Sequence, residues 1–349
     1  MQPIHYTKKG FEELSNLIVS KNYSKLFVLV DSNTIDACLP YFMSNLATTI
    51  PFEIVEIEPG EENKNIETCT MLWEVLTELE ADRNSVMLLL GGGVLTDLGA
   101  FVASTFKRGI DFILIPTTLL AMVDASVGGK TGVDLGVLKN QIGLFAMPEM
   151  VLIDSEFLST LEANQLRAGL AEVIKHGLIA DAEYFKKIEN LNSLTEENLL
   201  ELIEKSISIK QDIVSKDPTE KGLRKILNFG HTLGHAIESY CLENENRTTL
   251  LHGEAVAIGM YLESHISMQM HFIDKDSFQR IQKTLDHYFP RIAFTKTDID
   301  KTLTYLIHDK KNNNGLVNFS LLNGIGSSLW NKEVTNDLIF SAFDNYLNF

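Results

Sequence analysis

The sequence predicts an α/β domain built on a parallel β-sheet, followed by a second domain that is mostly α-helical. Three observations support this fold class. Short apolar and β-branched runs alternate with amphipathic segments in the first half of the chain, which is typical of βα units. Beyond about residue 160, long segments with apolar residues at helical spacing replace the strand-like runs. The length of 349 residues also exceeds what one hydrophobic core usually supports.

The expected elements follow one another along the chain. Strands are expected at residues 26–30, 52–57, 86–90 and 110–115, and a helix is expected at residues 63–80. Further helices are expected at residues 163–179, 196–214 and 253–270. The pattern changes near residues 154–161, so we expect one domain at residues 1–158 and a second at residues 159–349.

The charge of the chain excludes two classes of partner. The chain carries 47 acidic and 30 basic residues, a formal net charge of −17. This charge opposes binding to nucleic acid and to an anionic membrane surface. A ligand that carries phosphate must therefore meet a local cluster of cations.

The cysteines and the N-terminal segment predict a cytoplasmic protein. Cys38, Cys69 and Cys241 lie far apart and form neither a disulfide framework nor a CxxC zinc motif, which fits a reducing compartment. The first residues lack the cationic start and apolar run of a secretory signal. The longest apolar region, at residues 112–123, is interrupted by Pro116 and is too short to span a bilayer.

A glycine-rich turn is the first candidate for ligand binding. Gly91, Gly92 and Gly93 follow a buried strand and precede a helix, where backbone amides can approach a pyrophosphate. The spacing is not GxGxxG, and a tight turn that needs glycine for positive φ is an equally good interpretation. Asp31 could contact a ribose hydroxyl or cap a helix. The segment at residues 59–64 could form a turn and helix cap or contact the adenosine.

A second candidate is an anion site. Lys130 and Lys139 lie in glycine-rich segments, and Arg108 lies at an expected strand end, so their donors could converge on a phosphate. The string GGKTG is not a Walker A loop, because Asp124 stands where the first glycine of that motif is required. We therefore exclude a nucleoside triphosphatase.

A third candidate is a metal site. His231 and His235 would share one face of a helix, and two imidazoles with one carboxylate suit zinc with an open coordination position. Spacing alone does not choose the ligands, because Glu172 and His176 are also four residues apart and Glu254 lies beside His252. A site of two histidines and one glutamate is the hypothesis that this cluster supports.

Together these motifs resemble the 3-dehydroquinate synthase family. The resemblance extends from Asp31 to about Trp330, and the strings that carry it stand in the family's order: GGGVLTDLGAFVASTFKRGI, IPTTLLAMVDASVGGKTGVD, LKNQIG, AEVIKHG, LNFGHTLGHAIE and LHGEAVAIGM. It implies an N-terminal Rossmann-like domain that binds NAD and a helical C-terminal domain that binds metal and substrate. It also implies one zinc or cobalt ion per chain and a homodimer.

The resemblance also implies a role for each matching residue. The implied metal ligands are Glu172, His231 and His252. The implied catalytic residues are Asp124, Lys130, Lys175, Asn228 and His235. The implied substrate-binding residues are Arg108, Lys130, Asn140, Lys210, Arg224, Asn228, His235 and one of Lys310 and Lys311, with Lys210 and Arg224 on the substrate carboxylate. The implied NAD-binding residues are Asp31, Asn33, Glu61, Lys64, Gly92, Gly93, Val94, Asp97, Thr117, Thr118, Leu120, Lys130, Lys139, Phe157, Thr160 and Leu161.

The implied activity is conversion of 3-deoxy-D-arabino-heptulosonate 7-phosphate to 3-dehydroquinate and phosphate, a step of the shikimate pathway to aromatic amino acids. The implied route is transient oxidation by NAD, phosphate elimination, reduction and an intramolecular aldol step. Two alternatives remain: another NAD- and metal-dependent sugar phosphate cyclase, and a metal-dependent polyol dehydrogenase. Lys210 and Arg224 argue against a neutral sugar, which would offer these cations no carboxylate.

Overall fold

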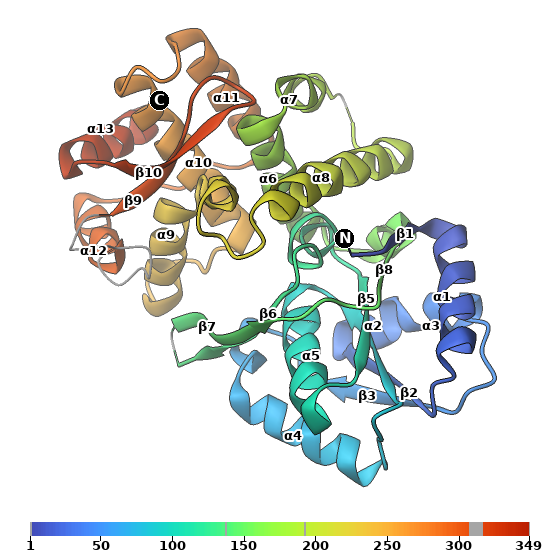
Figure 1. Cartoon of the computed structure of the whole chain (residues 1–349). Coiled ribbons are helices and arrows are strands. Elements are labelled where there is room, and N and C mark those ends of the chain that lie inside the picture. Colours follow the sequence, from blue (N-terminus) through green and yellow to red (C-terminus); the bar gives the residue numbers. More distant parts are fainter. Residues whose placement is uncertain (1, 137, 192, 307–316, 349) are drawn as a thin grey trace. The chain divides into compact units, whose positions relative to one another are not determined.

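The computed structural model describes residues 2–136, 138–191, 193–306 and 317–348. Contacts divide the chain into an N-terminal unit, Met1–Glu162, and a C-terminal unit, Ala163–Phe349 (Figure 1). The first contains a parallel sheet flanked by helices, and the second is mainly helical. The predicted fold class is therefore confirmed.

A six-stranded sheet, parallel throughout, forms the centre of the N-terminal unit. Its order is β1 (Ile4–Tyr6), β8 (Met150–Ile153), β5 (Asp111–Pro116), β4 (Val86–Gly91), β2 (Leu26–Asp31) and β3 (Phe52–Ile57). The four predicted strands are confirmed as β2, β3, β4 and β5. Every residue of β4 is buried, which explains the unbroken apolar run, because helices cover both faces of a parallel sheet.

The strand order contains a switch point between β2 and β4. The chain moves from β2 outward to β3, then returns to β4 on the other side of β2 and continues to β5 and β8. In open parallel sheets, ligands bind outside the carboxyl ends of the strands at such a point. The carboxyl ends of β2 and β4 carry Asp31 and the three-glycine turn.

Helices connect and flank these strands. They are α1 (Thr7–Lys21), α2 (Ser32–Ala37), α3 (Leu39–Asn45), α4 (Ile66–Glu78) and α5 (Gly93–Thr105). The predicted helix at residues 63–80 is confirmed as α4, and its N-terminus is capped by Asn65, whose side chain accepts from the Thr68 N–H at 2.9 Å.

An antiparallel hairpin of β6 (Lys130–Leu135) and β7 (Leu138–Phe145) was not predicted. Gly132 and Gly143 face each other in it, and a Cβ on either would lie 3.2 Å from the other's Cα. The hairpin therefore needs glycine at both positions. Because glycine is typical of loops, the sequence of this segment did not indicate strands. β6 packs against α5, and the Asp134 N–H donates to the Lys64 carbonyl at 2.8 Å.

The C-terminal unit is built around one helix. Its helices are α6 (Ala163–Ala180), α7 (Ala182–Glu189), α8 (Glu196–Lys216), α9 (His231–Glu243), α10 (His252–Gln269), α11 (Lys275–Tyr288), α12 (Lys296–Leu306) and α13 (Asn336–Leu347). A two-stranded antiparallel sheet pairs β9 (Asn318–Leu322) with β10 (Ser328–Glu333). The predicted helices at 163–179, 196–214 and 253–270 are confirmed as α6, α8 and α10. Helix α10 is buried on most of its surface and packs against α6, α9, α11 and α13.

Among the described residues, none of the helices combines the length and the apolar character needed to cross a lipid bilayer.

Candidate functional site

The three-glycine turn lies between β4 and α5 in the N-terminal unit, where it can serve as an anion site. Helix α5 begins at Gly93 without a side-chain cap, so its first N–H groups are left for another acceptor. Gly92 has φ of −73°, so the interpretation as a positive-φ turn is wrong for this residue. Its requirement is space, because a Cβ there would lie 3.1 Å from Thr118 Cγ2.

Asp31 caps helix α2 at the carboxyl end of β2. Its Oδ1 accepts from the backbone N–H groups of Asn33 at 3.0 Å and Thr34 at 2.8 Å. The capping interpretation from the sequence is therefore confirmed. Among the described residues, each hydrogen bond to this carboxylate goes to Oδ1, so Oδ2 is left for a ligand hydroxyl. The ribose contact stays a prediction.

A buried lysine joins the glycine turn to the hairpin. Lys64, 4 % exposed, donates to Asp97 Oδ2 at 2.7 Å and to Asn140 Oδ1 at 2.8 Å. Burial alone would lower the pKa of Lys64, but Asp97 and Glu61 offset it and raise the pKa above its ordinary value. Lys64 is therefore a fixed cation. Lys139 precedes Asn140 on β7, and its Nζ lies 3.5 Å from Oε1 of Glu61.

The other predicted NAD-binding residues also lie near carboxyl ends of strands. Those after β5 are Thr117, Thr118 and Leu120, and those after β8 are Phe157, Thr160 and Leu161. The Thr117 N–H donates to the Gly91 carbonyl at 3.0 Å, which ties the end of β5 to the glycine turn. Their role as NAD contacts stays a prediction.

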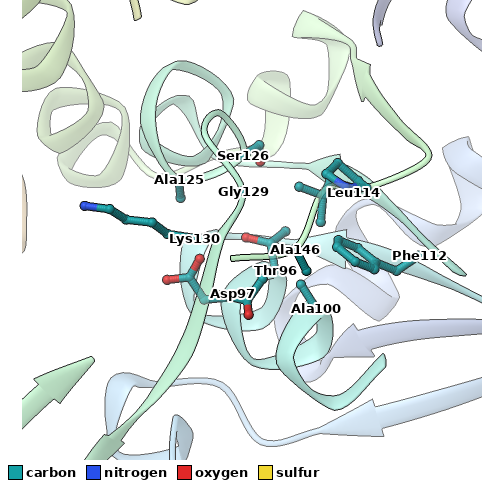
Figure 2. A pocket seen from close by; sticks show the side chains of 12 residues that line it. Thr96, Asp97, Ala100, Phe112, Leu114, Ala125, Ser126, Gly129, Lys130 and Ala146 are labelled. Atoms are coloured by element: carbon teal, nitrogen blue, oxygen red, sulfur yellow. The ribbon is translucent and has the colours of Figure 1, made fainter. Parts of the chain in front are cut away.

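Figure 2 shows a small cavity between α5, β5 and the hairpin, with Thr96, Asp97 and Ala125 among its lining residues. Its free volume of about 10 Å³ is that of a single water molecule, so it is no cofactor pocket. The Lys130 side chain extends away from the cavity (Figure 2) and is exposed. Arg108 is also exposed, and Asp124 lies in the π-helical turn Ala121–Ala125.

Glycines bring three helices of the C-terminal unit into close contact. A Cβ at Gly253 would overlap the Ala168 carbonyl oxygen, so α10 approaches the backbone of α6. A Cβ at Gly259 would overlap the Gly230 carbonyl oxygen and lie 2.8 Å from the Gly234 nitrogen, so α10 also approaches α9. These contacts bring together the candidate ligands of α6, α9 and α10.

The predicted metal ligands meet in this unit. Oε1 of Glu172 lies 3.4 Å from Nε2 of His231. The ring of His231 lies 5.2 Å from that of His235 and 5.3 Å from that of His252, between centroids. One ligand atom from each of the three histidines lies within 4.8 Å of the others. The structure thus gathers the three histidines and places Glu172 against His231, while the assignment of ligand roles stays a prediction.

The charges of this cluster suit a divalent cation. Glu172 is fully buried and forms an ion pair with buried Lys175. Burial would raise the pKa of Glu172, but Lys175 and the nearby imidazoles hold the pKa well below its usual range. Burial and the Lys175 charge lower the pKa of His231, which keeps its imidazole neutral. An anionic carboxylate and a neutral imidazole are the forms that bind metal.

Two further observations test the fit of a metal to these residues. Among the described residues, neither buried oxygen of Glu172 takes part in a hydrogen bond of good geometry, so both have acceptor capacity left. Glu254, the alternative carboxylate from the sequence, accepts from the Leu251 N–H at 3.1 Å and pairs with Arg167 at 3.2 Å. Its carboxylate caps α10, which favours Glu172 as the ligand.

The predicted substrate cations of the C-terminal unit are buried. Arg224 is 2 % exposed, and its Nη1 donates to the Pro218 carbonyl at 2.8 Å. Asp217 holds the preceding loop by accepting from the N–H groups of Gly222 at 2.7 Å and Arg224 at 3.0 Å. Lys210 is buried on α8.

The remaining predicted substrate residues are distributed differently. Asn228 donates to Glu220 Oε1 at 2.7 Å in the C-terminal unit. Asn140 is held in the N-terminal unit by Lys64 and by Asp134, whose Oδ1 accepts from its N–H at 2.6 Å. Lys310 and Lys311 lie outside the described residues.

Two buried carboxylates near the histidines were missed in the sequence analysis. Glu263 of α10 accepts from the N–H groups of Gly230 at 2.6 Å and Leu233 at 3.1 Å, and so caps the start of α9. Glu238 of α9 lies 3.2 Å from His252. Glu238 follows His231 by seven residues, so helical spacing could have placed it on the histidine face. No local signal marks Glu263, because its partners belong to another helix.

Solved structures define the class of the fold. The chain is similar to 2-deoxy-scyllo-inosose synthase, crystallised with carbaglucose-6-phosphate, NAD+ and Co2+, at 28% identity and a TM-score of 0.86, over 98% of this chain and 96% of that chain. It is similar to 2-epi-5-epi-valiolone synthase from Streptomyces hygroscopicus, with NAD+ and Zn2+ bound, at 27% identity and a TM-score of 0.85, over 99% and 96% of the two chains. The chain thus has the fold of dehydroquinate synthase-like sugar phosphate cyclases.

Sequence comparisons define the family within this class. Residues 54–168 match the family described as 3-dehydroquinate synthase N-terminal, and residues 169–312 match 3-dehydroquinate synthase C-terminal. A 3-dehydroquinate synthase of Parabacteroides distasonis is 40% identical over 336 residues, 96% of this chain and 94% of the relative. One of Clostridium beijerinckii is 40% identical over 96% of this chain and 95% of the relative. The chain belongs to the 3-dehydroquinate synthase family, as the resemblance predicted.

Proposed function

We propose that this chain converts 3-deoxy-D-arabino-heptulosonate 7-phosphate to 3-dehydroquinate and phosphate. One observation carries the proposal: in a chain of this family, His231 of α9 lies against both buried Glu172 of α6 and half-buried His252 of α10. The relatives at 40% identity over most of their length bear the name of this activity.

The N-terminal unit would hold NAD at the switch point of its sheet. NAD supplies the hydride acceptor that becomes the donor in the reduction, so none is consumed. The uncapped start of α5 offers N–H groups to the pyrophosphate, and Asp31 Oδ2 offers an acceptor to a ribose hydroxyl. Lys64 holds Asp97 and Asn140 in place beside this turn.

The C-terminal unit would hold the metal through Glu172, His231 and His252. A zinc or cobalt ion there would polarise the oxygen of the substrate alcohol whose carbon is oxidised. His235, at 5.2 Å from His231 between ring centroids, is near enough to bind substrate atoms beside the ion. In the N-terminal unit, exposed Lys130 would offer positive charge to a phosphate group.

Two buried cations favour this substrate over the neutral sugars of other cyclases. Arg224 and Lys210 are 2 % and 5 % exposed, and both lie in the C-terminal unit with the histidines. A guanidinium binds a carboxylate through paired hydrogen bonds, which the heptulosonate offers and a neutral sugar does not.

A phosphate-release assay tests the proposal. With the heptulosonate phosphate, we expect phosphate release that requires NAD, stops on addition of a strong chelator and returns with Zn2+ or Co2+. The near-ultraviolet absorbance of NADH should show no net rise, since the hydride returns to the substrate. Net NADH formation would instead favour a polyol dehydrogenase, and turnover of a neutral sugar phosphate alone would favour another cyclase.

We also propose that the protein forms a homodimer, which the edge of the sheet supports. Strand β3 ends the strand order, and Phe52 and Ile54, 42% and 44% exposed, lie on one of its faces. Exposed apolar side chains on an edge strand favour association with a second chain. We also propose the cytoplasm as the compartment, since Cys38, Cys69 and Cys241 are buried free thiols.

Ile54→Arg is expected to convert the dimer to monomers, because a charge would be buried in the shared surface. Light scattering coupled to gel filtration measures the mass. The control is Val19→Arg, the same change of an apolar side chain to arginine at a position of α1 that is 72% exposed. A monomeric parent protein would exclude the dimer, and a dimeric Ile54→Arg variant would exclude β3 as its surface.

A further inference from the structure

The carboxylate of Glu238 lies against the imidazole of His252. Oε2 of Glu238, on α9, is 3.2 Å from Nδ1 of His252, on α10. Glu238 is only 7 % exposed, whereas His252 is half-buried. A carboxylate is acceptor-only when ionised, so Nδ1 of His252 must carry the proton in this contact. The lone pair of His252 is therefore on Nε2.

His231 has the same arrangement with a different acceptor. Its Nδ1 lies 3.1 Å from the carbonyl oxygen of Phe229, and its Nε2 lies 3.4 Å from Glu172 Oε1. Both predicted histidine ligands thus direct Nδ1 into the protein and leave Nε2 for the cation. The acceptor behind His231 is a neutral carbonyl, while the acceptor behind His252 is a carboxylate.

The sequence of α9 explains why this carboxylate is in reach. Glu238 follows His231 by seven residues and His235 by three, so all three lie on one face of the helix. That face packs on α10, where His252 is the first helical residue. The contact of Gly259 with the Gly230 backbone keeps the two helices close enough for Glu238 to reach His252.

We propose that Glu238 is a positioning residue, which sets the tautomer and orientation of His252 and strengthens its bond to the metal. The inference rests on the proposed function, because it assumes that His252 is a ligand. A carboxylate that accepts from a ligating histidine raises the basicity of the imidazole and fixes the ring plane. A buried carboxylate does this more strongly than a carbonyl, since it carries a full negative charge.

Metal affinity of the purified apo-protein tests the inference without an activity assay. Zn2+ is titrated against a chromophoric chelator, and Co2+ is added separately for its visible absorption spectrum. Glu238→Ala should weaken Zn2+ binding by about 10–100-fold, the usual effect of losing an outer partner of a ligand. Glu238→Gln keeps an acceptor oxygen but loses the charge, so it should weaken Zn2+ binding less than Glu238→Ala does. The Co2+ absorption spectrum of Glu238→Gln should still differ from that of the parent protein.

Two comparisons separate this role from a general effect on folding. Glu243→Gln is the matched control, because Glu243 lies at the end of the same helix and accepts from the Tyr305 hydroxyl at 2.7 Å. It should bind Zn2+ like the parent protein. In a His252→Ala background, Glu238→Gln should produce no further loss, because its effect passes through His252.

Each outcome bears on one claim. The positioning role is wrong if Glu238→Gln has the Zn2+ affinity and the Co2+ absorption spectrum of the parent protein. It is also wrong if Glu238→Gln weakens Zn2+ binding further in the His252→Ala background. Glu238→Gln decides the matter even if Glu238→Ala does not fold, since glutamine occupies nearly the same volume. A parent protein that binds no Zn2+ would instead contradict the proposed function.

Discussion

Glu172→Gln is expected to leave the purified protein with little metal and to reduce phosphate release by more than 100-fold. Losing an outer partner of a ligand typically costs about 10–100-fold in affinity or activity, and losing the anionic ligand itself should exceed that range. The amide keeps the size of the side chain but removes the negative charge that balances the metal ion. Metal content by mass spectrometry and the phosphate-release assay measure the two effects.

The buried Lys175 complicates the single variant. Glu172 and Lys175 form an ion pair with almost no exposure, and removing one partner of a buried pair costs about 3–5 kcal/mol of stability. The double variant Glu172→Gln/Lys175→Met removes both charges, so it should fold better than Glu172→Gln and still lack metal. Glu183→Gln is the control, since the Glu183 side chain is 86% exposed on α7. Normal metal content in Glu172→Gln would refute the ligand assignment.

Periodicity in the sequence predicted the elements whose side chains form a continuous pattern. The apolar runs of β4 and β5 and the long amphipathic pattern of α8 belong to this group. Strands β1 and β8 escaped prediction because three or four residues are too few to define a period. The β6–β7 hairpin escaped because Gly132 and Gly143, which its backbone contact requires, are also typical of loops.

The candidate site shows the same limit at the level of single contacts. Residue types and helical spacing marked His231 and His235 as candidate ligands, whereas the choice of His231 and His252 came from the family resemblance. They did not reveal that Glu238 lies behind His252 or that Glu263 caps α9, because each contact joins two helices. Asp31 illustrates a third case, in which one residue type fits two roles and the structure shows only the helix cap.

Gly259→Ala is expected to destabilise the C-terminal unit and to weaken metal binding together. Its Cβ would overlap the backbone carbonyl of Gly230 and lie 2.8 Å from the Gly234 nitrogen, and neither backbone atom can rotate away. Overpacking a close contact usually costs about 1–3 kcal/mol, and a backbone clash belongs at or above the top of that range. Urea unfolding followed by circular dichroism, and Zn2+ titration of the folded variant, measure the two losses.

The loss of stability and the loss of Zn2+ affinity should occur together in Gly259→Ala. Helices α9 and α10 carry His231 and His252, so separating them to admit a methyl group should also separate the ligands. Gly93→Ala is the matched control for stability, because its Cβ would lie at an ordinary 3.4 Å from Ala125 Cβ in the N-terminal unit. Alanine at this helical position should change stability by under about 1 kcal/mol. If Gly259→Ala loses stability but keeps the parent affinity for Zn2+, the close contact of α9 with α10 does not position the metal ligands.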